Sequence, residues 1–174
     1  MKTVRKLAIG VGALSAMTSI AHAQNSSTAT ASGSATIIQP ISASATTPLA
    51  FGTIVKPNDA TTATVSVDNS GTRSITGTAA ALGSATAAGF AIVGEGGSAY
   101  NVTVPSSISL VSGTNTLVVA TTNNSGGSGI LGGVGASIGS TQTNTFGVGG
   151  SFAINSGTAS GAYTGTFTVT ADYQ

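Results

Sequence analysis

The chain lacks several residue types on which catalytic and metal-binding proteins commonly depend. Its 174 residues include no cysteine and no tryptophan, and the one histidine, His22, lies near the N-terminus. Without cysteine the chain can form neither disulfides nor thiolate metal sites, so packing and sheet hydrogen bonds must stabilise its fold. Ser-His and Cys-His catalytic pairs are also excluded from the chain beyond His22. We therefore expect no enzymatic activity, no cofactor and no metal.

Charged residues are scarce as well, at 5% of the chain. Three of the five basic residues are Lys2, Arg5 and Lys6, which leaves only Lys56 and Arg73 for the rest of the sequence. Two scattered cations cannot neutralise a run of phosphates or cover an anionic membrane surface. The sequence therefore argues against binding to nucleic acid.

The N-terminus has the pattern of a secretory signal peptide. Its basic residues precede an apolar stretch at 7–20, and Ala21-His22-Ala23 provides small residues at the −3 and −1 positions of a cleavage site. The stretch is shorter than the roughly 20 apolar residues of a transmembrane helix, and polar residues follow it at once. We expect removal of residues 1–23, export through the general secretory route, and no transmembrane segment in the mature chain. The protein would then reside at the cell surface, in the extracellular medium or in the periplasm.

The remaining sequence has the two-residue period of β-strands and few signals for helices. At the C-terminus, Tyr163, Phe167, Val169 and Tyr173 alternate with threonines, which predicts a strand with one packed face. A second run places alternate residues from Phe146 to Ile154 on one face, with glycines that indicate a close backbone approach. Turn signals recur about every 8 to 12 residues, the spacing of a β-sandwich. The sequence predicts an all-β, antiparallel sandwich.

Two segments fall outside this pattern. Residues 24–37 form an N-terminal extension of small and polar residues that ends at Ile37. Residues 123–140 form a Gly/Ser-rich loop within the domain at 38–174, and its composition favours a mobile insertion. The extension cannot anchor a strand by itself, but it could pair with a sheet of another molecule.

The four carboxylates after the signal peptide are Asp59, Asp68, Glu95 and Asp172. Each lies in or beside a turn signal or a terminus, where acidic side chains are usually solvated. We interpret them as solvated turn carboxylates rather than as the acid pair of a glycosidase.

The two ends of the mature sequence resemble a known family. The segment Ser34-Ala35-Thr36-Ile37-Ile38-Gln39-Pro40-Ile41, the later Leu49-Ala50-Phe51-Gly52-Thr53-Ile54, and the ending from Gly161 to Tyr173 look like an uncharacterised family of exported bacterial proteins, a domain of unknown function. More distantly they resemble spore-coat-U-like proteins and archaic chaperone–usher pilins. In such pilins a glycine about fourteen residues from the C-terminus and a penultimate aromatic residue mark the last strand, and Gly161 and Tyr173 occupy those positions.

The resemblance implies an immunoglobulin-like, pilin-like sandwich that lacks its final strand and receives it from the next subunit. The donor strand would present Ala29, Ala31, Gly33, Ala35 and Ile37. The strand bordering the acceptor groove would include Gly161, Tyr163, Phe167, Val169 and Tyr173. The partners implied are copies of this chain or related subunits, together with a periplasmic chaperone and usher. The chain departs from those pilins in lacking their disulfide and in having a donor face of mostly alanine and glycine.

We therefore expect a non-enzymatic structural or adhesive protein that assembles by β-strand addition, as a pilin-like subunit or a cell-surface component. One alternative is a self-contained sandwich that binds a glycan or another surface partner through the 123–140 loop. Another is an amyloid-type matrix fibre, which low charge favours. The first two alternatives differ in whether residues 24–37 are needed for stability.

Overall fold

A computed structural model of the chain describes residues 26–123 and 127–174. The expected signal peptide lies outside the described residues. The chain divides into two units, at 1–35 and 36–174. In the first unit, the described residues 26–35 are exposed and belong to no strand or helix.

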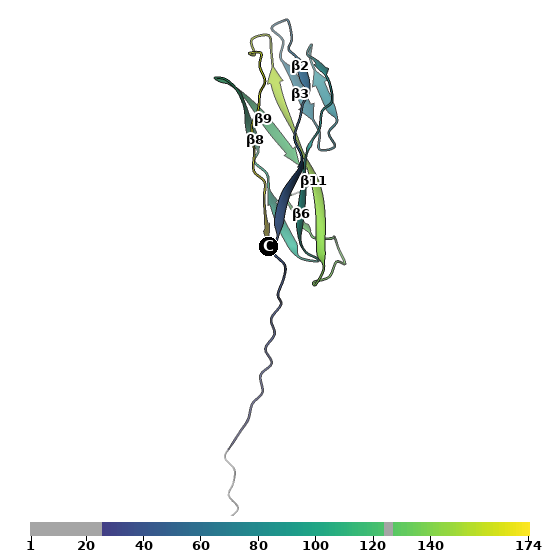
Figure 1. Cartoon of the computed structure of the whole chain (residues 1–174), viewed down its shortest axis with the longest axis vertical. Helices are drawn as coiled ribbons and strands as arrows, with labels where there is room; N and C mark the ends of the chain where they lie inside the picture. Colours follow the sequence, from purple (N-terminus) through teal and green to yellow (C-terminus); the bar gives the residue numbers. More distant parts are fainter. Residues whose placement is uncertain (1–25, 124–126) are drawn as a thin grey trace, which may run out of the picture. The chain divides into compact units, whose positions relative to one another are not determined.

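The second unit is built of antiparallel β-sheets, as the two-residue period predicts (Figure 1). Its largest sheet has the order β1-β6-β11-β3-β4, with β9 paired to β11 and β8 paired to β9. This sheet curls into a half-barrel. Its strands are β1 (Ser42–Thr47), β3 (Ala63–Val67), β4 (Arg73–Thr76), β6 (Ala88–Glu95), β8 (Ser107–Ser112), β9 (Asn115–Asn123) and β11 (Thr141–Ile154).

Two smaller sheets complete the unit. The three-stranded sheet has the order β10-β7-β12, and the two-stranded sheet pairs β2 with β5. Their strands are β7 (Ala99–Thr103), β10 (Ser128–Ile130), β12 (Thr170–Tyr173), β2 (Thr53–Val55) and β5 (Ala80–Leu82). Every pairing in the three sheets is antiparallel.

Strand β11 is the longest, and it exchanges partners along its length. Its first part pairs with β6 from Thr141 to Val148, and its last part pairs with β3 from Gly150 to Ile154. On the edge that faces β6, β9 follows as the partner from Val148 to Ser151, while β3 lies on the opposite edge. Glycine at 147 lets the turn after β3 approach closely, because a Cβ there would lie only 2.0 Å from the carbonyl oxygen of Asn69. The predicted close backbone approach is therefore confirmed.

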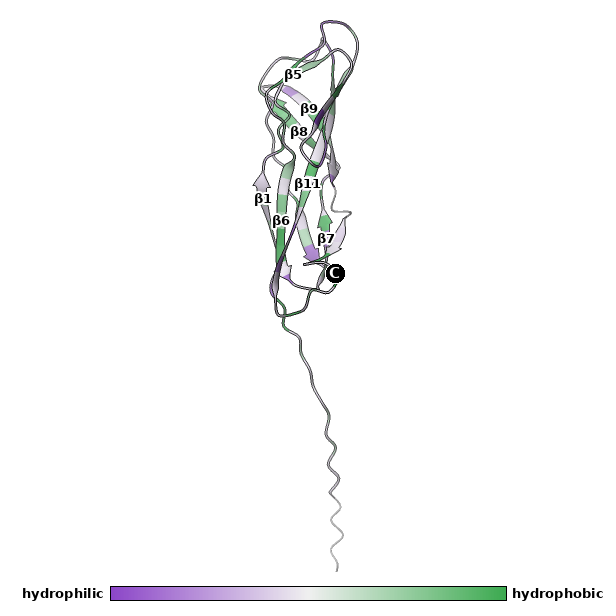
Figure 2. Ribbon diagram, turned by 90° about the vertical axis from the view of Figure 1, so that its right-hand side faces the viewer, coloured by the Kyte–Doolittle hydropathy of each residue, from purple (hydrophilic) through white to green (hydrophobic). Residues whose placement is uncertain are grey.

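The buried side chains form two clusters. Most of their members lie on strands that contain hydrophobic residues, which Figure 2 colours green. We call the two clusters the Phe152 cluster and the Phe90 cluster. The Phe152 cluster contains Phe51, Ala63, Val65, Val67, Ile108, Val119, Phe152 and Ile154. The Phe90 cluster contains Ala88, Phe90, Ile92, Tyr100, Val102, Leu131, Phe146 and Val148. Phe167 and Leu49 pack against both clusters.

The C-terminal strand is shorter than its alternation predicts. The sequence pattern extends from Tyr163 to Tyr173, but β12 begins only at Thr170, where it pairs with β7. Upstream, a single bridge joins Thr164 to Val111 of β8, and residues 165–169 belong to no strand. The alternation of half-buried and exposed side chains nevertheless continues through this segment. The predicted alternation of side chains is therefore confirmed, whereas residues 165–169 make no strand pairing in the described part of the chain.

The expected insertion at 123–140 is also more ordered than its composition suggests. Its described residues contain the short strand β10, and Leu131 is fully buried in the Phe90 cluster. The described part of the insertion therefore contains a strand and a buried side chain, and the expected mobility of residues 123–140 stays a prediction. Composition did not indicate that Leu131 would be buried.

Candidate functional site: an open apolar cavity

A cavity of about 900 Å³, lined by both polar and apolar groups, opens at the end of the domain that contains the Phe152 cluster. One lip of the cavity is the segment 49–56, which includes β2, and the other lip is the segment 158–165, which precedes the C-terminal strand. Phe152, Ile154, Leu110 and Leu117 line it between the lips. A volume of this size is at the upper end of the range for ligand sites.

The first lip is extended and pairs on one side only. Ala50 bridges Thr86, and Thr53 to Val55 pair with β5. The Phe51 ring turns inward and meets Phe152 edge to face, with 4.8 Å between the ring centroids. Backbone hydrogen-bonding groups on the side of this lip away from β5 have no strand beside them among the described residues.

The second lip belongs to the segment in which the sequence predicts the acceptor strand. Gly161 and Tyr163 line the cavity, as does Gly165. Gly161 lies against β8, where a Cβ would meet the Ser112 hydroxyl oxygen at 2.2 Å. The Tyr163 hydroxyl donates a hydrogen bond to the Ala159 carbonyl oxygen at 2.9 Å.

The other three residues predicted for the acceptor groove lie farther along the same segment. Phe167, Val169 and Tyr173 are half-buried and pack against the Phe90 cluster. The Phe167 ring meets Phe90 at a centroid distance of 5.7 Å. The structure therefore brings two of the five predicted residues to the cavity and places three beside the neighbouring core.

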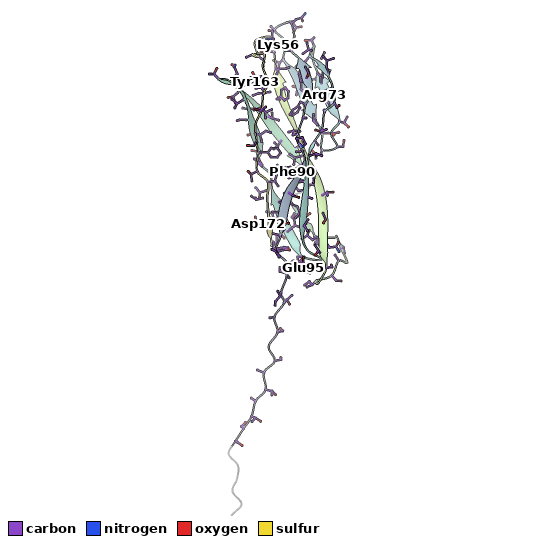
Figure 3. The ribbon with its side chains drawn as sticks, in the orientation of Figure 1. Lys56, Arg73, Phe90, Glu95, Tyr163 and Asp172 are labelled. Carbon is purple, nitrogen blue, oxygen red and sulfur yellow. The ribbon has the colours of Figure 1, made fainter. Side chains whose placement is uncertain are left out.

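Both cations of the described residues bind backbone carbonyls around the cavity (Figure 3). The Lys56 ammonium group donates a hydrogen bond to the Thr158 carbonyl oxygen at 2.9 Å and so connects the two lips. Arg73 donates to the Phe51 carbonyl oxygen at 2.7 Å and to the Gly83 carbonyl oxygen at 2.9 Å. These contacts join the first lip to the second lip and to the turn after β5.

At the opposite end of the domain, Glu95 forms a second cluster of polar contacts that sequence reasoning missed. The carboxylate is 1% exposed, which corrects its interpretation as a solvated turn residue. It accepts backbone N–H groups from Gln39, at 3.0 Å, and from Gly139. These two hydrogen bonds, the one from Gln39 first, hold the pKa of Glu95 below its ordinary value of 4.5.

Gln39 is fixed by further contacts to the same end. The Tyr173 hydroxyl donates a hydrogen bond to the Gln39 carbonyl oxygen at 2.8 Å and accepts one from the Glu95 backbone N–H at 2.7 Å. Thr141 donates its hydroxyl to the Gln39 side-chain oxygen at 2.7 Å. The chain therefore enters the folded domain at a defined point, Gln39. No sequence motif predicts these long-range contacts.

Asp59 and Asp68 are turn carboxylates, as expected. Asp68 accepts backbone N–H groups from Ser70 and Thr72, and Asp59 accepts the Thr61 hydroxyl. The main cause that lowers the pKa of Asp68 is the hydrogen bond from the Ser70 side chain. For the pKa of Asp59 it is the hydrogen bond from the Thr61 side chain. Asp172 is exposed on β12.

The residues predicted for the donor strand are exposed. Ala29, Ala31, Gly33 and Ala35 lie in the described part of the first unit, outside any strand. Ile37, in the second unit, is 91% exposed. Among residues 26–123 and 127–174, no three His, Cys, Asp or Glu side chains gather as metal ligands, and no helix could cross a membrane.

Searches among curated proteins and among solved structures give no match to this chain. A family model does match, over residues 41–173, and it is described as a domain of unknown function, DUF4402. The matched range includes both lips of the cavity and Glu95. Because this range covers most of the sequence, the chain belongs to the DUF4402 family.

Proposed function

We propose that this protein is an exported, non-enzymatic structural subunit whose domain is completed by a β-strand from another molecule. In this proposal the fold is an immunoglobulin-like, pilin-like sandwich that lacks one strand, and the cavity is the place of that strand. The distant resemblance to chaperone–usher pilins, in the residues near both ends of the chain, supports the same mechanism.

The observation that carries the proposal is an open cavity between two extended segments, each of which pairs with a strand on one side only among the described residues. The segments 49–56 and 158–165 border the cavity, and residues 165–169 continue the second lip outside any strand. A strand inserted between the lips would supply backbone hydrogen bonds to both and cover Phe51 and Phe152. A small ligand could fill the cavity but could not satisfy two extended backbones.

The donor in this proposal is the extension at 24–37 of a second copy or a related subunit. Alternate residues Ala29, Ala31, Gly33, Ala35 and Ile37 would face the cavity, because side chains of a strand alternate between its two faces. Only Ile37 is large, so most of the binding would come from main-chain hydrogen bonds. Before assembly the exposed cavity would need protection, which a periplasmic chaperone and an usher would provide.

Cysteine cross-linking tests this proposal cleanly, because the natural chain has no cysteine. We would place one cysteine in the extension, Ala31→Cys, and one on the second lip, Ala162→Cys. Under oxidising conditions the double variant should form a ladder of covalently linked chains on a non-reducing gel. Mixing the two single variants should give a dimer that contains one of each.

The matched control moves the donor cysteine by one position, to Thr30→Cys, which faces the opposite side of an inserted strand. Cross-linking at 31 well above that at 30 supports insertion with the proposed alternation. Equal or absent cross-linking at both positions contradicts strand addition. A chain beginning at Ile38 that is monomeric and melts like the full mature chain would favour the self-contained binding module instead.

A further inference from the structure

The loop at 131–140 is anchored by hydrogen bonds at the end of β6. Leu131 exchanges backbone hydrogen bonds with the turn after β6, donating to Ser98 at 3.1 Å and accepting from Gly97 at 3.0 Å. Gly132 donates its N–H to the Asn144 side-chain oxygen at 3.0 Å, and Gly139 donates to the Glu95 carboxylate. The loop is therefore fixed at its start by Leu131 and at its end by Glu95.

This fixed loop presents large apolar side chains to solvent. Val134 is 96% exposed and Ile138 is exposed as well, while Ile37 and Ile38 are exposed just before the anchored Gln39. Gln39 and Gly139 donate to the two oxygens of one carboxylate, so the two segments are neighbours. Ile37 belongs to the proposed donor strand, so we call the remaining three residues, Ile38, Val134 and Ile138, the end surface. An anchored, exposed apolar group of this kind is typical of a contact site.

The occupant of the end surface follows from where the extension begins. Gln39 is fixed to the domain, and Ile37 is the last residue of the proposed donor strand. Two residues of chain span at most about 7 Å. The copy that accepts the extension must therefore lie directly beside the end surface, and no other partner could occupy that space once assembly has occurred.

The position of the cavity also indicates which part of the accepting copy is involved. The C-terminal segment runs from the end of the domain that contains Lys56 toward the end that contains Glu95 and Asp172 (Figure 3). A donor strand antiparallel to this segment leaves the cavity near Lys56. At that end Val55 of β2 and Leu82 of β5 are 49% and 62% exposed.

We propose that the end surface of one copy packs on Val55 and Leu82 of the copy that accepts its extension. This inference rests on the proposed strand addition. It describes a head-to-tail contact between two different surfaces of the same chain, which propagates as an open filament. The contact compensates for the small donor side chains, because it adds apolar burial outside the cavity.

The test replaces the most exposed residues of the end surface. A double variant, Val134→Asp with Ile138→Asp, should weaken concentration-dependent association of the mature chain by about tenfold or more, measured by sedimentation velocity. Val118→Asp is the matched control, since Val118 is 60% exposed on β9 and belongs to neither proposed surface. Under conditions that keep the protein monomeric, the double variant and the Val118→Asp control should have the melting temperature of the natural chain, because these side chains face solvent.

The accepting surface is tested by Leu82→Asp, which should weaken association as much as the double variant does. Unchanged association of either variant overturns the inference. So does an equal loss for Val118→Asp, which would show a general effect of added charge.

The Ala31→Cys and Ala162→Cys reporter separates this inference from the proposed function. If the reporter cross-links and the end-surface variants associate normally, the end-to-end contact is wrong and strand addition stands. If association depends on Val134 and Leu82 but the reporter never cross-links, the contact between copies is supported and strand addition is wrong.

Discussion

The two core clusters are alike in size but differ in how they are covered. Each contains eight buried residues, and each includes a pair of aromatic rings in contact. The Phe90 cluster is covered by the paired strands β10, β7 and β12, whereas the Phe152 cluster borders the open cavity. The comparison indicates that the open end does not lack apolar residues. In the described part of the chain it lacks a strand between the two lips, 49–56 and 158–165.

The largest effect that separates the two clusters should come from truncating one isoleucine in each. Ile92→Ala in the Phe90 cluster should lower the free energy of unfolding by about 4 kcal/mol, because it leaves an enclosed void. Ile154→Ala should cost only about 2 kcal/mol, because Ile154 already lines the cavity and its removal encloses no new void. Urea unfolding of both variants measures the difference. Equal losses would show that the cavity end is packed as tightly as the other.

A smaller difference is expected between two tyrosine hydroxyls. Tyr173→Phe removes the contacts to the Gln39 carbonyl oxygen and the Glu95 backbone N–H, which should lower the free energy of unfolding by about 2 kcal/mol. Tyr163→Phe removes one contact at the cavity and should cost about 1 kcal/mol. Thermal or urea unfolding at neutral pH checks the order. A larger loss of unfolding free energy for Tyr163→Phe than for Tyr173→Phe would contradict the interpretation that hydrogen bonds stabilise the Glu95 end more than the cavity end.

The smallest effect should come from protonation of Glu95, which occurs only in acid. Its pKa is lower in the folded protein than its ordinary value of 4.5, so folding is stabilised fully above about pH 4.5. The stabilisation is lost as the pH falls from there through the pKa of the folded protein. Unfolding curves measured between pH 7 and pH 3 should show this loss.

Glu95→Gln is the control, because it removes this titration and retains one acceptor oxygen. Asp59 and Asp68 also have lowered pKa values and remain in both proteins, so the relevant quantity is the difference between the two curves. The natural chain should lose stability more steeply than the variant below pH 4.5. Parallel curves would mean that the carboxylate of Glu95 gains nothing from its two N–H donors.

Much of the fold could be predicted from local patterns. Alternation of side chains placed the strands around Val65, Phe90 and Phe152 correctly, because a sheet with one buried face imposes that alternation on the sequence. The same alternation predicted a strand from Tyr163, and the side chains do alternate in burial. It could not reveal that residues 165–169 are outside any strand, because pairing depends on a second segment that the alternation does not describe.

The residues that sequence reasoning misjudged depend on distant contacts. Glu95 follows a strand and precedes glycines, so local sequence describes it as a turn carboxylate. Its burial comes from Gln39 and Gly139, both more than forty positions away. Leu131 likewise looks isolated in a Gly/Ser-rich stretch, and only the packing of β6 beneath it explains its burial. For the candidate site, the resemblance places Gly161 and Tyr163 beside an acceptor groove, and in the structure both line the cavity, while their role as an acceptor stays a prediction.

Strand β11 belongs to both clusters, since Phe146 and Val148 lie in one and Phe152 and Ile154 in the other. The two ends of the domain therefore share one continuous backbone element, and neither end can melt without disturbing its ladder with β6 or β3. The domain should behave as one cooperative unit, in which a strand bound at the cavity also protects amide hydrogens of β6 from exchange with solvent. A strand bound at the cavity should therefore slow the unfolding of the whole domain.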